Sequence, residues 1–411
     1  MKKVWQECIE CHSTYYADII KYRCDCGGLL EVRMDLESLG DVSWDKFRSR
    51  KFNVWRYFEL LPFEGYNRVV SLDEGGTPLY KCEKLADWLG ARDLYVKYEG
   101  MNPTGSFKDR GMCIGITKAL KLGAKGVACA STGNTAASLA AYSAKAGIPC
   151  IVMVPKQAVA LGKLFQAMLY GAKVVRLEGT FDEALNLVWK VAEEVGAYLL
   201  NSINPWRLEG QKTVAFETVD QLGRVPGYVA LPVGNCGNIA AAWKGFREME
   251  AVGLINERPS MVGIQSEGAS PFVDLVKEGL ATLKPVEKPS TIASAIRIGR
   301  PVNWKKALLA VKESDGLVAK VSDNEIIEAQ RMLASLEGIG VEPAAAASVA
   351  GVKKLIESGD MDANDTIVCI CTGSMLKDPS PELIKGLESI DVMPNPELVR
   401  NLFAYLLSRR S

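Results

Sequence analysis

From residue 92 the chain alternates between short runs rich in β-branched residues and longer amphipathic or alanine-rich stretches. Short apolar runs are typical of buried strands, whereas the longer stretches have the period of helices. Such alternation predicts right-handed βαβ units and mainly parallel sheets covered by helices. The expected strands are 94–99, 126–131, 148–155, 172–178, 197–202, 228–234, 261–267 and 365–373, and the expected helices include 134–146, 180–195, 237–250 and 323–337. The fold class is therefore α/β, and chemistry is expected in the loops that follow the strands.

Length and charge narrow the function classes. The 411 residues suffice for two or three domains, and 49 basic residues balance 49 acidic ones. No net field draws this chain to nucleic acid or to an anionic membrane. No apolar run approaches the length of a membrane span, and the first residues lack the apolar core of a signal peptide. We therefore expect a cytoplasmic protein with a small-molecule partner and with reduced cysteines.

The first 35 residues form a Cys-rich segment of different character. Two residues separate Cys8 from Cys11, whereas one residue separates Cys24 from Cys26, which precedes a glycine pair. Four thiolates on two turns can enclose a structural Zn²⁺, so these four residues are candidate metal ligands in a zinc-ribbon-like segment. The second pair is closer than the usual CxxC spacing, and the only histidine, His12, is a possible substitute ligand. The alternative is a ribbon without metal that packs on the rest of the chain.

The stretch 102–111, NPTGSFKDRG, places Lys108 on a Gly-Ser turn at an expected helix start. Unpaired backbone N–H groups and the positive end of the helix dipole disfavour an ammonium there, which favours the neutral amine. Lys108 is thus a candidate Schiff-base lysine. The alternative is a solvated surface charge.

The expected strand 126–131 ends in a loop that runs directly into a helix. Ser131, Thr132, Asn134 and Thr135 supply hydroxyls, an amide and free N–H groups, which suit a carboxylate ligand. An ordinary helix cap explains the same residues.

Two further loops follow expected strands. Gly234, Asn235, Cys236, Gly237 and Asn238 can fold the backbone into a bowl whose N–H groups hold a phosphate without a lysine. The alternative is a plain glycine turn. The loop matches neither GxxxxGK[ST] nor GxGxxG, so ATP and dinucleotides are not indicated.

The last strand is followed by Thr372, whose hydroxyl can form a neutral hydrogen bond to a ring nitrogen, unless the loop is a simple turn. A lysine, a carboxylate cradle, a phosphate bowl and a neutral hydroxyl together fit one ligand, an amino acid joined to pyridoxal 5′-phosphate. The motifs resemble the fold-type II pyridoxal-phosphate enzymes, of the tryptophan synthase β type, and within them the threonine synthases. They are NPTGSFKDRG (102–111), STGNTAASLAAYSA (131–144), NSINPWRLEGQKT (201–213), PVGNCGN (232–238), AIRIGRPVNW (295–304), EPAAAASVAG (342–351) and CTGSMLKDP (371–379).

The resemblance implies roles for the cofactor-binding residues. Lys108 would hold the cofactor covalently and move protons, and Asn134 would bond the phenolic oxygen. Residues 234–238 would bind the cofactor phosphate, and Thr372 would face the pyridine nitrogen. Lys108 and Thr135 are the expected catalytic residues.

The resemblance also implies the substrate, O-phospho-L-homoserine, which would react with water to give L-threonine and phosphate. An arginine suits the second phosphate because a guanidinium binds it bidentately, although Arg207 alone is also explained by a surface ion pair with Glu209. The expected substrate-binding residues are Ser131, Thr132, Thr135, Asn201, Ser202 and Arg207.

Three residues depart from the family's pattern, Cys236, Arg300 and Met375, and they bear on the substrate more than on the cofactor. Two enzyme alternatives therefore remain. One is a cysteate synthase-like β-replacement on O-phosphoserine with a sulfur nucleophile, and the other is a serine or threonine dehydratase. A third alternative is a non-catalytic binding protein on the same scaffold.

The expected architecture has three parts. A Cys-rich segment spans 1–35, a large α/β domain spans 36–104 and 205–411, and a small α/β domain, 105–204, is inserted into it. Residues 36 to about 90 are interpreted as a helical lead-in whose aromatic residues pack in the core. The tail from residue 394 is expected to be an amphipathic helix that covers the body or contributes to a homodimer interface.

Overall fold

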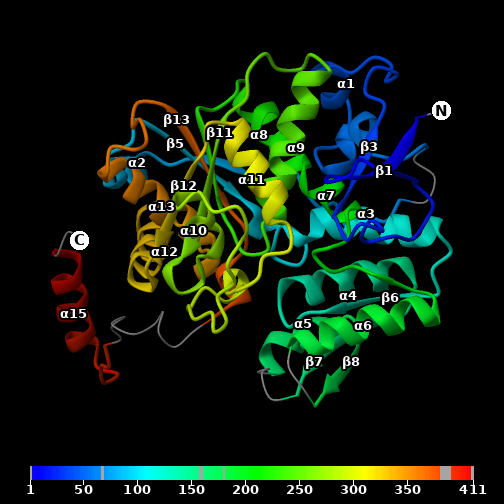
Figure 1. Ribbon diagram of the computed structural model, residues 1–411. Helices are drawn as coiled ribbons and strands as arrows, with labels where there is room; N and C mark the ends of the chain where they lie inside the picture. Colours follow the sequence, from blue (N-terminus) through cyan, green and yellow to red (C-terminus); the bar gives the residue numbers. More distant parts are fainter. Residues whose placement is uncertain (1, 66–68, 157–160, 179–180, 380–389, 409–411) are drawn as a thin grey trace. The chain divides into compact units, whose positions relative to one another are not determined.

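The computed structural model describes residues 2–65, 69–156, 161–178, 181–379 and 390–408 (Figure 1). The chain divides into two compact units, Met1–Asp378 and Pro379–Ser411. The second unit contains helix α15 (Pro396–Ser408), which confirms the helix expected in the tail; its last residues, 409–411, lie outside the described part. No helix in the described ranges is long and apolar enough to cross a membrane.

The first unit is built around a six-stranded sheet. All neighbouring strands in it are parallel except the edge strand β4, which pairs antiparallel with β5. In sheet order the strands are β12 (Leu317–Val321), β11 (Ser260–Ser266), β10 (Tyr228–Pro232), β13 (Thr366–Cys371), β5 (Asp93–Tyr98) and β4 (Leu79–Lys81). The helical lead-in expected up to residue 90 is thus wrong at β4, because the open edge of β5 takes up this short segment as a strand.

Both faces of this sheet are covered, as the alternation of side chains along β13 shows. Ile367, Cys369 and Cys371 belong to one core, whereas Val368 and Ile370 belong to the other. The helices on the first face are α2 (Glu83–Leu89), α12 (Asp323–Glu337) and α13 (Pro343–Glu357). Those on the second face are α8 (Thr213–Leu222), α9 (Gly237–Ala251), α10 (Pro271–Lys277) and α11 (Trp304–Glu313).

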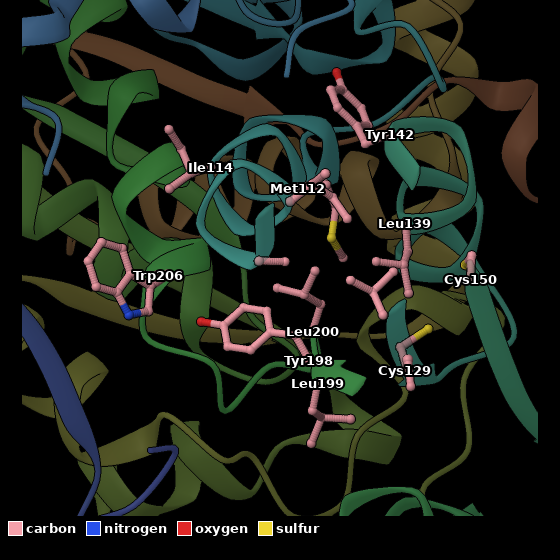
Figure 2. Close-up of a cluster of buried hydrophobic side chains, with 14 of the residues drawn as sticks. Met112, Ile114, Cys129, Leu139, Tyr142, Cys150, Tyr198, Leu199, Leu200 and Trp206 are labelled. Atoms are coloured by element: carbon pink, nitrogen blue, oxygen red, sulfur yellow. The ribbon is translucent and has the colours of Figure 1, made fainter. Parts of the chain in front are cut away.

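A second, four-stranded sheet is wholly parallel. Its order is β8 (Lys173–Leu177), β7 (Cys150–Pro155), β6 (Gly126–Ala130) and β9 (Ala197–Leu199). The helices beside it are α3 (Lys108–Lys121), α4 (Asn134–Ala146), α5 (Leu161–Leu169) and α6 (Phe181–Val195). Figure 2 shows Met112 of α3, Leu139 of α4 and Cys129 of β6 within one apolar core. The strands of this sheet all fall within 105–204, but the division into a large and a small domain stays a prediction.

The N-terminal segment forms an antiparallel sheet in the order β2 (Thr14–Tyr16), β1 (Val4–Cys8) and β3 (Leu30–Met34). It is attached to the rest of the unit through buried backbone. Lys306 Nζ donates to Leu30 O at 2.7 Å, and Lys244 Nζ donates to Val32 O. Strand β3 is therefore held by β1 and by two lysine side chains of the larger sheet's helices.

Short helices complete the unit. They are α1 (Trp44–Arg48), η1 (Val54–Leu60), η2 (Glu99–Met101), α7 (Trp206–Gln211), η3 (Glu267–Ala269), η4 (Ser294–Ile296) and η5 (Met375–Lys377). Of the aromatic residues of the lead-in, Phe47, Trp55, Tyr57 and Phe58 are buried as expected, whereas Trp44 and Phe52 are half-buried. The expected helix 180–195 begins at Phe181 in the structure, and residue 180 lies outside the described ranges.

Candidate active site

Three adjacent strands of the large sheet send their following loops to the same edge. In this sheet β10, β13 and β5 are neighbours. The loop after β10 is the 234–238 turn, the loop after β13 begins at Thr372, and the chain after β5 leads through η2 to Lys108. Parallel strands place these loops together, so segments distant in sequence line one pocket.

The pocket lining contains most of the residues that the sequence singled out. Those that line it are Lys108, Asn134, Ser202, Arg207, Gly234, Asn235, Cys236, Gly237, Asn238 and Thr372. Four others lie next to it without forming its wall: Ser131, Thr132, Thr135 and Asn201. Their individual roles stay predictions.

Asn201 already has a structural function. Its side-chain oxygen accepts from Ala130 N at 3.0 Å, and its amide nitrogen donates to Ala130 O at 2.9 Å. Both ends of the amide therefore hold the end of β6 beside β9. Contact with a substrate phosphate would require the amide to leave these bonds.

Lys108 is the first residue of α3, as the sequence predicted. The turn before it is fixed by Asp109, whose carboxylate accepts from Thr104 N at 2.7 Å, Thr104 Oγ1 at 2.6 Å and Ser138 Oγ at 2.5 Å. The accessible part of Lys108 faces the pocket that it lines. Burial of the amine, helped by the charge of Arg207, lowers the pKa of Lys108 to about 7. A solvated surface lysine does not fit this environment.

The 234–238 loop presents unused backbone donors. The N–H groups of residues 234–239 donate to no acceptor within the described ranges, and no side chain caps the start of α9. Cys236 has a left-handed backbone, with φ of 62°, which turns the chain sharply before the helix. A Cβ at Gly234 would lie 3.1 Å from Ala295 O, so this glycine allows the close approach of the opposite loop. Free donors at a helix start form an anion site, which a plain glycine turn does not explain.

Arg207 is a buried cation that has no anionic partner among the described residues. Its side chain is 2% exposed and has no hydrogen bond or ion pair to any described residue, and its Nε is fully enclosed. Burial lowers its pKa to about 10. The surface pair with Glu209 is wrong, because Glu209 is itself buried and binds Lys212 at 2.6 Å and Lys244. A desolvated guanidinium in a pocket is a receptor for an anion.

Thr372 directly follows strand β13 and contacts the turn that precedes Lys108. It is 4% exposed, and its carbonyl accepts from Phe107 N at 3.0 Å. Its hydroxyl makes no hydrogen bond to the described residues and stays available to a ligand. The bond to Phe107 ties the end of β13 to the start of α3.

Glu342 is a pocket residue that the sequence analysis did not single out. It is 2% exposed, and its two carboxylate oxygens accept from Asn134 Nδ2 at 3.1 and 3.0 Å. Burial raises the pKa of Glu342 to about 7. The sequence feature that could have identified it is a charged residue directly before the Pro-Ala run of a largely buried helix.

The four cysteines of the N-terminal segment gather as predicted. Their sulfur atoms all lie within 4.8 Å of one another, with Cys8 Sγ 3.6 Å from Cys26 Sγ and Cys11 Sγ 3.4 Å from Cys24 Sγ. A tetrahedral ZnS₄ centre has S···S separations of about 3.8 Å, so the donor set fits Zn²⁺. His12 is not in this group, and its ring contacts Glu7 at 3.4 Å instead.

Comparisons with known proteins agree with this geometry. A family model described as pyridoxal-phosphate dependent enzyme matches residues 70–373. The threonine synthase of Methanocaldococcus jannaschii is 54% identical over 403 residues, which cover 98% of this chain and 100% of the relative. That of Methanosarcina acetivorans is 53% identical over 395 residues, or 96% of this chain and 95% of the relative. A maize serine racemase has a TM-score of 0.63 at 21% identity over 81% of this chain and 93% of its own, a likeness of fold alone.

Proposed function

The chain belongs to the pyridoxal-phosphate dependent enzymes, among the threonine synthases, and on this premise we propose that it converts O-phospho-L-homoserine and water to L-threonine and phosphate. The family match also confirms the expected fold type. The exact substrate and the roles of single residues are part of the proposal.

The pocket fits pyridoxal 5′-phosphate on its own chemistry. The N–H groups of residues 234–239, which have no acceptor in the described ranges, suit the cofactor phosphate, and Lys108 supplies an amine of which about half is neutral at pH 7. Asn134 would bind the phenolic oxygen, and the hydroxyl of Thr372 would meet the ring nitrogen without adding charge. When bound, this cofactor acts as an electron sink that stabilises negative charge on substrate carbon.

One observation carries the choice of substrate: Arg207 is buried and has no ionic partner in the described part of the chain. The cofactor has a single phosphate, and the 234–239 donors account for it. Arg207 is therefore a second anion site in the same pocket, on a different helix. A substrate with its own phosphate would use it, whereas the substrate of a dehydratase would leave a buried charge uncompensated.

The proposed mechanism assigns proton transfer to Lys108. A neutral amine can take the proton from the substrate α-carbon and return one later, because its pKa lies near the working pH. Arg207 would stabilise the negative charge of the departing phosphate, with Ser202 beside it in the pocket wall. Ser131, Thr132 and Thr135 would hold the substrate carboxylate near the start of α4, and Thr135 would assist catalysis. Asn201 would join Ser202 and Arg207 only after releasing Ala130.

The function is tested by supplying O-phosphohomoserine and O-phosphoserine separately to the purified holoenzyme and following threonine and phosphate. We expect both products from phosphohomoserine alone. Turnover of phosphoserine only, and only with sulfite or sulfide, would transfer the assignment to the β-replacement alternative. A protein that takes up no pyridoxal phosphate would overturn both.

Arg207→Gln tests the second anion site. Because the guanidinium binds the substrate phosphate before and during its departure, we expect kcat/KM to fall by about 10²-fold or more, with part of the loss in KM. The matched control is Arg176→Gln, on the exposed face of β8, which should leave both constants unchanged. Equal kinetics of Arg207→Gln and the original enzyme would show that the phosphate is bound elsewhere.

Several features beyond the pocket belong to the same proposal. We propose a small inserted domain of residues 105–204, with the cofactor between it and the large domain, and a structural Zn²⁺ on Cys8, Cys11, Cys24 and Cys26. A homodimer and a cytoplasmic location are proposed with them. Sedimentation of the purified enzyme tests the dimer directly.

A further inference from the structure

Glu342 is the buried ionisable group of the pocket that the reaction proposed above does not use. It is the N-cap residue of α13. Its backbone is held in place because Glu342 N donates to Gly373 O at 3.0 Å. A Cβ added to Gly373 would lie 2.6 Å from Glu342 Oε1, so the carboxyl fills the space that the glycine leaves. The position of this carboxyl is therefore set by the backbone on both sides.

Within the described ranges, Asn134 is the only hydrogen-bond donor to this carboxyl. Both oxygens accept from the same atom, Nδ2, at 3.0 and 3.1 Å. An ionised carboxylate is acceptor-only, so it must face the amide nitrogen. A neutral carboxylic acid also has a donor, and it can bind the amide oxygen instead.

We propose that Glu342 is a positioning residue that acts through Asn134: its protonation state decides which end of the Asn134 amide faces the pocket. This inference rests on the proposed function, in which Asn134 meets the phenolic oxygen of the cofactor. With Glu342 ionised, the amide nitrogen is held on the carboxylate. With Glu342 neutral, the amide can turn over and exchange donor for acceptor at the cofactor.

The surroundings of Glu342 set the pH at which this change occurs. Its carboxyl is desolvated, which favours the neutral form, and the hydrogen bond from Asn134 favours the ionised form. The charged or titratable groups that face it are Asp378, which favours the neutral acid, Lys377 and Lys108, which favour the carboxylate, and the phenol of Tyr98. The balance leaves the carboxyl with a pKa of about 7, close to the range in which an enzyme works.

The amide orientation has a chemical consequence. A donor toward the phenolic oxygen stabilises its anionic form, whereas an acceptor stabilises the protonated form. The absorbance of the bound cofactor reports this proton. Glu342 would thus make the spectrum of the resting enzyme depend on pH even without substrate.

The experiment is a pH titration of the visible absorbance of the holoenzyme, without substrate, in the original chain and in Glu342→Gln. We expect a spectral transition near pH 7 in the original and none in the variant, because glutamine does not titrate. Retention of the same transition in Glu342→Gln would overturn the inference.

Substitution of two charged neighbours of Glu342 should shift its pKa in opposite directions. Asp378→Asn removes a negative charge and should move the midpoint to lower pH, while Lys377→Gln removes a positive charge and should move it to higher pH. Neither residue lines the pocket, and neither affects the pKa of Lys108. Shifts in the same direction, or no shift in either, would overturn the inference even if Glu342→Gln folds poorly.

The outcome separates the two proposals. A holoenzyme that makes threonine but shows an unchanged transition in the variants contradicts only the role of Glu342. A protein that binds no cofactor contradicts the proposed function itself.

Discussion

Burial and residue type together decide the chemistry of single residues in this pocket. Lys108 and Arg207 are both basic residues, of which Lys108 is half-buried and Arg207 is buried, and desolvation lowers the pKa of both. The amine can escape the cost of desolvation by releasing its proton, whereas the guanidinium stays charged and must attract an anion. In the proposed function, the same environment therefore suits Lys108 to act as a nucleophile and Arg207 to bind an anion.

After removal of the cofactor, the protonation of Lys108 can be followed through the reactivity of its amine. Since its pKa is lowered to about 7, the reactive neutral form grows as pH rises and dominates above pH 7. Trace acetylation read at Lys108 by mass spectrometry should rise through pH 7 and then level off, with the exposed Lys145 as internal reference. Arg207→Gln should move the midpoint to higher pH, because Arg207 lowers the pKa of Lys108. A midpoint near pH 10 in the unaltered chain would contradict the buried environment.

At the scale of elements, the contact between α3 and α7 brings these two cations into one pocket. The helices meet at glycines: a Cβ on Gly210 would lie 1.7 Å from Arg110 O, and one on Gly111 would lie 2.9 Å from Arg207 O. Backbones that approach this closely leave no room for a side chain. The position of Arg207 relative to Lys108 therefore depends on residues that do no chemistry.

Gly210→Ala tests this packing. The added methyl collides with backbone that cannot rotate away, so α7 must shift, and we expect destabilisation by about 1–3 kcal/mol together with weaker substrate binding. Denaturant unfolding and KM are the measurements. Gly40→Ala is the matched control, because nothing lies within 4 Å of its Cβ position. Equal stability of the two variants would show that the helices are not held by this contact.

The Cys-rich segment is the element whose stability is expected to depend on metal. We predict one zinc per chain in the purified protein, lost in Cys24→Ser and retained in Cys150→Ser, whose thiol is buried in β7. Because Lys306 and Lys244 bind the backbone of β3, loss of metal should loosen β1 and β2 first. Metal analysis would measure the zinc content, and amide hydrogen exchange would show whether β1 and β2 lose protection before β3. Purified chain without zinc would contradict the prediction.

At the scale of the whole first unit, a buried ionic network joins the six-stranded sheet to α3, the helix that begins at Lys108. Arg110 of α3 binds Glu99 at 2.6 Å and Glu217 of α8 at 2.6 Å, and Glu217 also binds Lys97 of β5 at 2.8 Å. The side chains in these pairs are fully buried. Burial opposes the charge on Glu217, but Arg110 and Lys97 outweigh it and lower its pKa to about 2.

Glu217→Gln should therefore destabilise the unit by about 3–5 kcal/mol near neutral pH, since two buried cations lose a partner. The stability that Glu217 contributes is present above its unfolded pKa of about 4.3 and is lost as pH falls toward the folded value of about 2. The difference between variant and original should thus shrink over this interval in urea unfolding. Glu357→Gln, in an exposed pair, should change stability by less than about 0.5 kcal/mol. A constant difference at all pH values would contradict the ionic origin.

The local sequence pattern was enough to predict those features that are specified by residues close together in the chain. Apolar runs located the strands from β5 onward, except for β12, and a Gly-Ser turn before Lys108 indicated the first residue of α3. Cysteine spacing identified the four thiols that meet. In each case the residues that specify the feature lie within a few positions of it, or repeat with the period of a strand or helix.

Tertiary structure alone decided the rest. The sequence by itself determined the fold class, the order of the strands along the chain and the residue types of the pocket. It did not determine that Arg207 has no anionic neighbour in the described ranges, that Asn201 is bound to Ala130 or that Glu342 faces Asn134 across 208 positions. Each of these facts depends on which distant segment supplies the neighbouring atoms. The charge and pKa of each side chain depend on its burial and on its hydrogen-bond and ionic partners. These are fixed only when the folded chain brings the distant segments together.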